Sequence, residues 1–152
     1  ASYLELAAFI SNYGSNIESD LVELFRRIVF NVAVKNTDDH LRNHGFLFDG
    51  SGWRLSPAYD INPNPEGTGL SLNISETSND LDLDLVLQQA RFFRLSDDDA
   101  LNLINKVISV VSRFEDFART ADIDSQEVKI MQRAFMTQDE AEEQLVGLPT
   151  RI

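Results

Sequence analysis

An abrupt change of polarity at Lys35 constrains the fold of this chain more than any other feature. The preceding segment, residues 28–34, is apolar on nearly every side of a helical wheel, and the following segment, residues 36–44, is almost wholly polar. A helix that is apolar all round is buried at the centre of a domain. We therefore expect a central buried helix that ends directly in a polar loop, and such a helix is the rigid support that a functional site needs.

Helical patterns account for most of the rest of the chain. Ser2 and Glu5 have the spacing of a capping box at the start of a first helix, which Gly14 ends. The central helix is expected to begin near Asp20. Further helices are expected over 84–93, from Ser96 to Phe114, from Asp124, and from Thr137. We expect residues 1–136 to form one domain and residues 137–152 to be an acidic last helix or tail.

A short β-hairpin is expected over residues 45–55. Two apolar runs, 45–48 and 53–55, flank the turn sequence Asp49-Gly50-Ser51-Gly52. Residues 57–61 leave this hairpin, and the loop that follows holds two prolines and two glycines between Asn62 and Gly69. The expected fold class is therefore mainly α, with one small hairpin near the central helix.

The composition limits the classes of function. The formal net charge is −12, which argues against a nucleic-acid surface because phosphate binding needs clustered Lys and Arg. The chain has no Cys, which excludes disulfides and thiolate zinc sites and fits a cytoplasmic protein. The apolar runs are too short to span a bilayer, so we expect no membrane association. Cationic partners, such as metal ions or a basic protein, suit this charge.

The polar loop carries the residue types that phosphoryl transfer needs. The reaction requires a group that accepts or orients the proton of the attacking hydroxyl, and oxygen ligands that hold Mg²⁺ against the phosphates. Protein kinases place an Asp, four residues and an Asn in one loop, followed by a hairpin and a second metal-binding Asp. This chain has Asp38, four residues, Asn43, the expected hairpin and then Asp60. The order and spacing together indicate a kinase-type site.

Two segments resemble signature motifs of the HipA-type serine/threonine kinases. Residues 36–43, Asn-Thr-Asp-Asp-His-Leu-Arg-Asn, resemble the catalytic loop of that family. Residues 55–61, Leu-Ser-Pro-Ala-Tyr-Asp-Ile, resemble its metal-binding loop. The resemblance covers nearly the whole chain, and it implies the C-terminal lobe of a protein-kinase-like fold, with the hairpin between the catalytic loop and the metal loop at 57–61.

The resemblance also implies a role for each matching residue. Asp38 would be the catalytic base, and Asn43 and Asp60 would bind the Mg²⁺ that accompanies ATP. We include His40 among the catalytic residues and expect it to orient the loop by hydrogen bonds. HipA-like proteins are toxins of bacterial toxin–antitoxin pairs, linked with persistence, and a HipB-type helix-turn-helix antitoxin usually holds them inactive. A protein substrate and such an antitoxin are therefore the expected partners.

Two departures from the family pattern are visible. Lys35 stands where the family often has a glycine before the Asn-Thr-Asp-Asp-His run. The chain also lacks the Gly-rich loop and the strand lysine that grip ATP in kinases. The nearest match, Gly67-Thr68-Gly69, has no third glycine and lies after the catalytic loop. We therefore expect little phosphotransfer activity from this chain alone.

Two other functions are consistent with the same residues. A metal-dependent hydrolase would use Asp38, Asp39, His40, His44 and Asp60, and the two histidines have the four-residue spacing that binds Zn²⁺ from one helical face. The Glu that follows the first His in hydrolytic zinc motifs is absent. The other alternative is a helical interaction module without chemistry, since paired Asp residues also cap helices.

Overall fold

The computed structural model describes residues 1–145, so the last part of the expected acidic tail, residues 146–152, lies outside the described residues. Within the described chain the elements are α1 (Tyr3–Tyr13), α2 (Ile17–Ala33), η1 (Leu41–Asn43), β1 (Phe46–Phe48), β2 (Trp53–Leu55), α3 (Leu83–Gln88), η2 (Ala90–Phe93), α4 (Asp97–Val111), α5 (Phe114–Thr120), α6 (Ser125–Met131), η3 (Gln132–Ala134) and α7 (Gln138–Leu145). The expected fold class, mainly α with one two-stranded hairpin, is confirmed.

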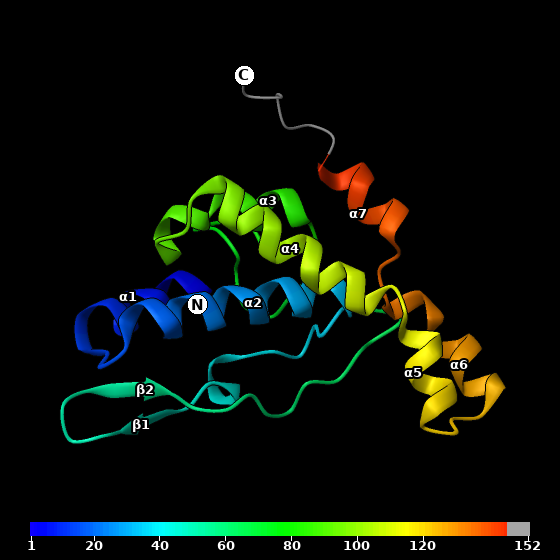
Figure 1. The fold of residues 1–152 in the computed structure, drawn as a ribbon, viewed down its shortest axis with the longest axis horizontal. Coiled ribbons are helices and arrows are strands. Elements are labelled where there is room, and N and C mark those ends of the chain that lie inside the picture. Colours follow the sequence, from blue (N-terminus) through cyan, green and yellow to red (C-terminus); the bar gives the residue numbers. More distant parts are fainter. Residues whose placement is uncertain (146–152) are drawn as a thin grey trace.

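Helix α2 is the centre of the fold. Figure 1 shows α3 and α4 on one side of α1 and α2, with the hairpin and the long loops on the other side. The apolar side chains of α2 that are larger than Ala and at most 1% exposed are Leu21, Leu24, Phe25, Ile28, Val29 and Val32. Each such burial contributes about 1.5–3 kcal/mol, so this helix supplies a large part of the core. The prediction of a central buried helix is confirmed.

Helix α2 ends in a Schellman motif that turns the chain into the loop of residues 36–43, the candidate catalytic loop. The Asn36 N–H donates to Asn31 O at 2.9 Å, and the Lys35 N–H donates to Val32 O at 3.3 Å, which is the pattern of this motif. Lys35 therefore has the left-handed backbone that the motif requires, with φ at 52°. Glycine is the usual residue there because it has no Cβ. The glycine that HipA-type sequences often have at this position thus has a structural reason.

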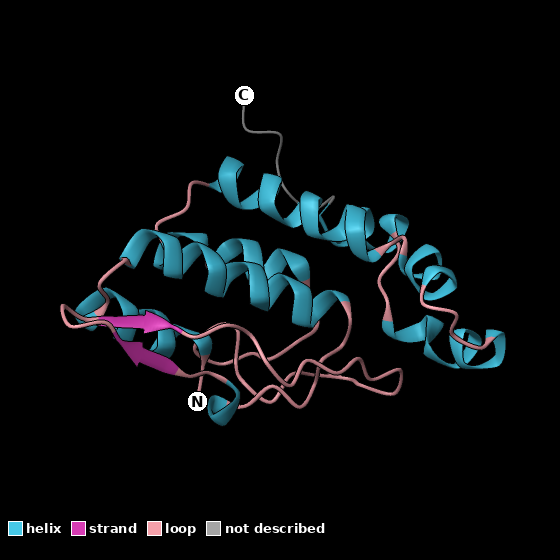
Figure 2. Ribbon diagram, turned by 60° about the horizontal axis from the view of Figure 1, so that its bottom comes forward, coloured by secondary structure: helices cyan, strands magenta, loops and turns pink. Residues whose placement is uncertain are grey.

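The hairpin lies where the sequence predicts it. Figure 2 shows its two strands side by side, and Phe46 pairs with Leu55 in an antiparallel register. The Asp49 carboxylate accepts the Ser51 N–H at 2.9 Å and so helps to close the turn. Phe9 of α1 packs on Phe46, with ring centroids 4.6 Å apart. This contact holds the hairpin against the first helix.

The expected start of α2 near Asp20 is wrong, and Asp20 instead contacts the hairpin. The helix begins at Ile17 rather than near Asp20, so Asp20 lies inside the helix instead of capping it. The Asp20 carboxylate is buried and accepts the Leu55 N–H at 2.9 Å. A side chain that looked like a helix-start signal therefore anchors strand β2.

Two further helices are shorter than expected. The helix expected over 84–93 is divided into α3 and the 3₁₀ turn η2. Arg94, the residue after η2, has a left-handed backbone with φ at 56°. The long helix expected to reach Phe114 is two helices, because α4 ends at Val111 and α5 begins at Phe114. Ser96 caps α4, since its Oγ accepts the Asp99 N–H at 3.1 Å. None of the described helices is long and apolar enough to cross a membrane.

Substitutions at Lys35 test the end of α2. We expect Lys35→Gly to raise the free energy of unfolding by about 0.5–1 kcal/mol, because it removes a left-handed penalty of roughly 1–2 kcal/mol at a smaller entropic cost. The β-branched Lys35→Val should instead lower it by about 1 kcal/mol or more. Urea unfolding of the two variants checks this, and equal stability of Gly and Val at this position would contradict it.

Candidate active site

The catalytic loop presents Asp38 to solvent and holds Asn43 inside. Asp38 is exposed, and within the described residues its carboxylate has no hydrogen-bond or ion-pair partner. Asn43 is 7% exposed and its amide nitrogen donates to the Asp38 carbonyl at 3.3 Å. The Asn43 N–H also donates to His40 O, which forms the 3₁₀ turn of the loop. Because the amide nitrogen of Asn43 donates to the Asp38 carbonyl, the amide oxygen is the side-chain atom of Asn43 that is available to bind a cation.

The candidate metal loop, residues 57–61, is joined to the candidate catalytic loop directly by one hydrogen bond and through the hairpin by a second. The Tyr59 hydroxyl donates to the Arg42 carbonyl at 2.8 Å. The Ser56 N–H donates to the Gly45 carbonyl at 2.8 Å, where the hairpin opens. A Cβ on Gly45 would lie only 3.0 Å from Ser56 Oγ, so this close approach favours glycine. The two loops are therefore held against each other at the open end of the hairpin.

Asp60 adopts a backbone conformation that is uncommon for a residue with a side chain. Its φ is 55°, its side chain is exposed, and its carboxylate accepts the Asn62 amide at 2.8 Å. Left-handed residues other than glycine concentrate at functional sites, where the surrounding structure stabilises them. The conformation turns the chain immediately after Tyr59, which is the residue bound to the catalytic loop.

A buried polar network supports the catalytic loop from beneath. Asp39 is 3% exposed, and its Oδ2 accepts the Tyr3 hydroxyl at 2.6 Å and the Asn31 amide at 2.8 Å. His44 Nε2 lies 2.8 Å from the same oxygen and must donate to it, because a carboxylate only accepts. The Asn36 amide donates to Asn31 Oδ1 at 3.0 Å. The network thus joins α1, α2 and both ends of the loop.

Tyr3 stays protonated in this network. Burial first, and then the charge of Asp39, raise the pKa of the Tyr3 phenol well above its ordinary value. The hydroxyl therefore remains a donor to Asp39 throughout the physiological pH range. The sequence did not single out Tyr3 or Asn31, although an Asn inside an otherwise apolar helix is a signal for such a buried contact.

The two histidines contact different partners. His44 binds Asp39, whereas His40 Nε2 lies 3.4 Å from Arg42 Nη2. The second ring nitrogen of His40 is buried without a hydrogen-bond partner in the described structure. Residues 1–145 also contain no group of three or more His, Asp or Glu side chains placed to hold a metal ion. The arrangement therefore gives no support to a zinc hydrolase site.

The segment of residues 62–71, which follows the metal loop, packs on the catalytic loop. Thr37 is the point of contact: the Asn64 amide donates to its Oγ1 at 2.9 Å, and the Ser71 hydroxyl donates to its carbonyl at 2.7 Å. A Cβ on Gly67 would collide with the Thr37 methyl group. This glycine is thus explained by close packing within the domain, without a phosphate.

The oxygen donors of Asn43 and Asp60 fit Mg²⁺ in type and number. Mg²⁺ is usually held by one or two protein oxygens and completes its shell with water and substrate phosphate oxygens. One amide oxygen and one carboxylate, carried by two loops that are hydrogen-bonded together, match that requirement. Two oxygens are too few for a structural Ca²⁺ cage, which needs six to eight.

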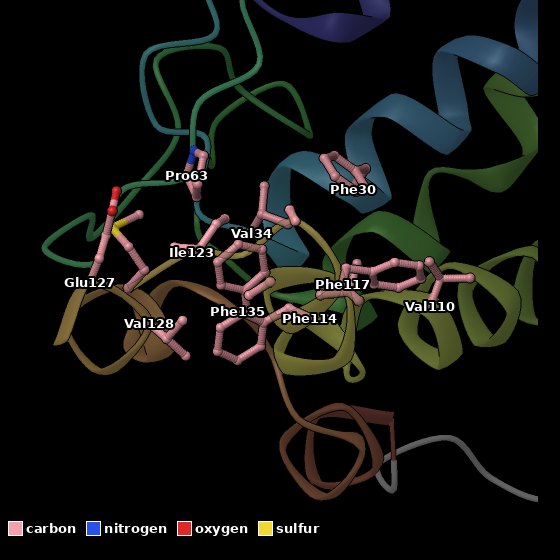
Figure 3. A pocket seen from close by; sticks show the side chains of 14 residues that line it. Phe30, Val34, Pro63, Val110, Phe114, Phe117, Ile123, Glu127, Val128 and Phe135 are labelled. Carbon is pink, nitrogen blue, oxygen red and sulfur yellow. The ribbon is translucent and has the colours of Figure 1, made fainter. Parts of the chain in front are cut away.

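An apolar hollow of about 470 Å³ lies away from this constellation, between the ends of α2 and α4 and helices α5 and α6. Figure 3 shows Phe30, Phe114, Phe117 and Phe135 around it. Its only titratable lining residue is Glu127. A hollow with one carboxylate and no second polar group lacks the acid, base and metal ligands that phosphoryl transfer requires.

Removing the Tyr3 hydroxyl tests the network. We expect Tyr3→Phe to lower the free energy of unfolding by about 1.5–3 kcal/mol, because it deletes a buried hydrogen bond to a carboxylate and leaves Asp39 with one donor fewer. Tyr13→Phe is the matched control, since Tyr13 is 59% exposed on the same helix and its ring contact with Phe9 survives. Chemical unfolding measures both, and equal effects would contradict a buried role for Tyr3.

Two comparisons with known proteins bear on this geometry. A Haemophilus influenzae protein (strain ATCC 51907 / DSM 11121 / KW20 / Rd) named "Putative kinase" is 38% identical over 61 residues, which are 40% of this chain and 18% of that protein. The alignment thus covers less than a fifth of the relative's length. A family model described as "HipA-like C-terminal domain" matches residues 1–122, which include both loops and every member of the buried network. The chain therefore belongs to the family of HipA-like C-terminal domains.

Proposed function

We propose that this domain is the catalytic and metal-binding part of a serine/threonine protein kinase, which transfers the γ-phosphoryl group of ATP to a protein hydroxyl. The observation that carries the proposal is the pairing of Asn43 with the Asp38 carbonyl in one loop, tied through Tyr59 to the loop of Asp60. Asp38 is an exposed carboxylate, and these hydrogen bonds join the loops that carry Asn43 and Asp60, which supports the proposal. Membership of the HipA-like family and the kinase name of the relative support it.

The chemistry assigns a separate task to each residue. Asp38, exposed and without a partner in the described structure, accepts or orients the proton of the incoming Ser or Thr hydroxyl. Asn43 and Asp60 would hold Mg²⁺ through their side-chain oxygens, and the ion would supply neutralisation of the phosphate charge. Asp39 takes no direct part, because its carboxylate is buried among three donors.

The described residues do not supply the elements that grip ATP in protein kinases. The described chain has no strand-rich lobe, and Gly67 is committed to Thr37. Phosphotransfer by the 152-residue chain alone is therefore expected to be weak, and the complete reading frame should be the active form. A protein substrate, a HipB-type antitoxin and a cytoplasmic location belong to the same proposal, through the family.

Exchanging each of the two adjacent aspartates separates catalysis from support. In the protein of the complete reading frame, Asp38→Asn should lower the rate of ATP-dependent phosphorylation by about 10²–10⁴-fold, because a general base of this kind contributes that factor. Its unfolding midpoint should stay near that of wild type, since the side chain is exposed. Asp39→Asn should lower the midpoint, because it changes the acceptor of a buried network.

The controls decide between a kinase and an interaction module. Asp98→Asn, an exposed carboxylate at the start of α4, should leave the phosphorylation rate unchanged. A wild-type protein of the complete reading frame that phosphorylates no Ser or Thr, its own included, would contradict the proposal. Full activity of Asp38→Asn would remove Asp38 from its role.

A further inference from the structure

One face of α2 carries three buried polar side chains, and each contacts a different part of the site. They are Asp20, Arg27 and Asn31, which are 3%, 7% and 3% exposed. Their spacing of seven and four residues places them in one row along the helix. Asp20 binds the backbone of strand β2 and Asn31 binds the catalytic loop, as described above. Arg27 lies between them and has no part in the catalytic set.

Arg27 reaches the point where the hairpin passes into the metal loop. Its Nη2 donates to the Ser56 carbonyl at 2.6 Å, and its Nε donates to Glu23 Oε1 at 3.1 Å. The Ser56 N–H is already bonded to Gly45. Ser56 is thus held on one side by the hairpin and on the other by a guanidinium from α2, one residue before the metal loop begins.

Within the described residues, no other side chain of α2 hydrogen-bonds to residues 56–61. Two hollows, of about 640 and 420 Å³, flank Arg27, and the first is lined by Ser56 and Pro57 while the second is lined by Ala58 and Ile61. The loop therefore passes over open space on both sides of the guanidinium. A single charge-assisted hydrogen bond therefore does more to fix the position of a loosely packed loop than that of a well-packed segment.

Stability alone does not account for this arginine. Its Nη1 is buried without a hydrogen-bond partner within residues 1–145, and burying an unpaired polar group is unfavourable. Apolar side chains of similar volume often replace buried charges without loss of stability. A residue that breaks a packing rule beside a functional loop is expected to serve that loop.

We propose that Arg27 is a positioning residue for the metal site: through the Ser56 carbonyl it fixes the loop that carries Asp60. The inference rests on the proposed function, because it takes Asp60 as a ligand of the catalytic Mg²⁺. Partners that hold a metal ligand in place typically change metal affinity by 10–100-fold when they are removed. Loss of Arg27 should therefore raise the Mg²⁺ concentration that gives the half-maximal rate, while the protein stays folded.

The test compares two neighbouring arginines in the protein of the complete reading frame. Arg27→Met removes the guanidinium and keeps much of the side-chain volume. Arg27→Lys keeps a positive charge and a single donor nitrogen in place of the guanidinium fork. Arg26→Met is the matched control, because Arg26 pairs with the same Glu23, is 50% exposed and makes no hydrogen bond or ion pair with the metal loop in the described structure. Phosphorylation rates are measured against Mg²⁺ concentration, with unfolding midpoints of all variants.

The inference predicts that Arg27→Met raises the Mg²⁺ concentration for half-maximal rate by about 10-fold or more, with Arg27→Lys in between and Arg26→Met within about 2-fold of wild type. An unchanged Mg²⁺ requirement in a folded Arg27→Met or Arg27→Lys protein would overturn it. So would a loss of stability with no change in that requirement, since that describes a purely structural residue. A wild-type protein without phosphotransfer would overturn the proposed function itself, which is a different result.

Discussion

One oxygen atom, Asp39 Oδ2, joins parts of the chain that are far apart in sequence. It accepts hydrogen bonds from Tyr3 of α1, Asn31 of α2 and His44 at the end of the catalytic loop. All three donors are directed at a carboxylate that is shielded from water, where each charge-assisted bond is strong and a missing one is costly. The backbone on both sides of Asp39 is therefore fixed, and that backbone carries Asp38 and Asn43.

Helix α2 supplies the rest of the support, with different residues for different tasks. Its apolar side chains form the centre of the core, and its row of buried polar side chains holds β2, the start of the metal loop and the catalytic loop. The Schellman motif at its end then turns the chain into the site. A helix with most of its side chains in the core can position three segments at once, because it cannot shift without disturbing the core.

The main features of the fold, and the loops that carry the candidate site, were predictable because they depend on local patterns. The apolar run before Lys35 predicts the central helix, and the order of Asp38, Asn43, the hairpin and Asp60 predicts a kinase-type arrangement. Two adjacent aspartates cannot be told apart in this way, since only tertiary contacts bury Asp39 and expose Asp38. Tyr3 was missed for the same reason: its partner is 36 residues away along the chain. The start of α2 was misplaced because Asp20 has the chemistry of a helix cap but serves strand β2.

The central claim is that Asn43 and Asp60 form a divalent-cation site beside Asp38. The most direct measurement is the paramagnetic broadening of backbone amide signals by substoichiometric Mn²⁺ in the ¹⁵N-labelled protein, with and without an ATP analogue. The account predicts that broadening begins at residues 38–43 and 59–62 and is lost in Asp60→Ala. Broadening centred instead on the acidic segments at 80–84 or 97–99, or unaffected by Asp60→Ala, would contradict it.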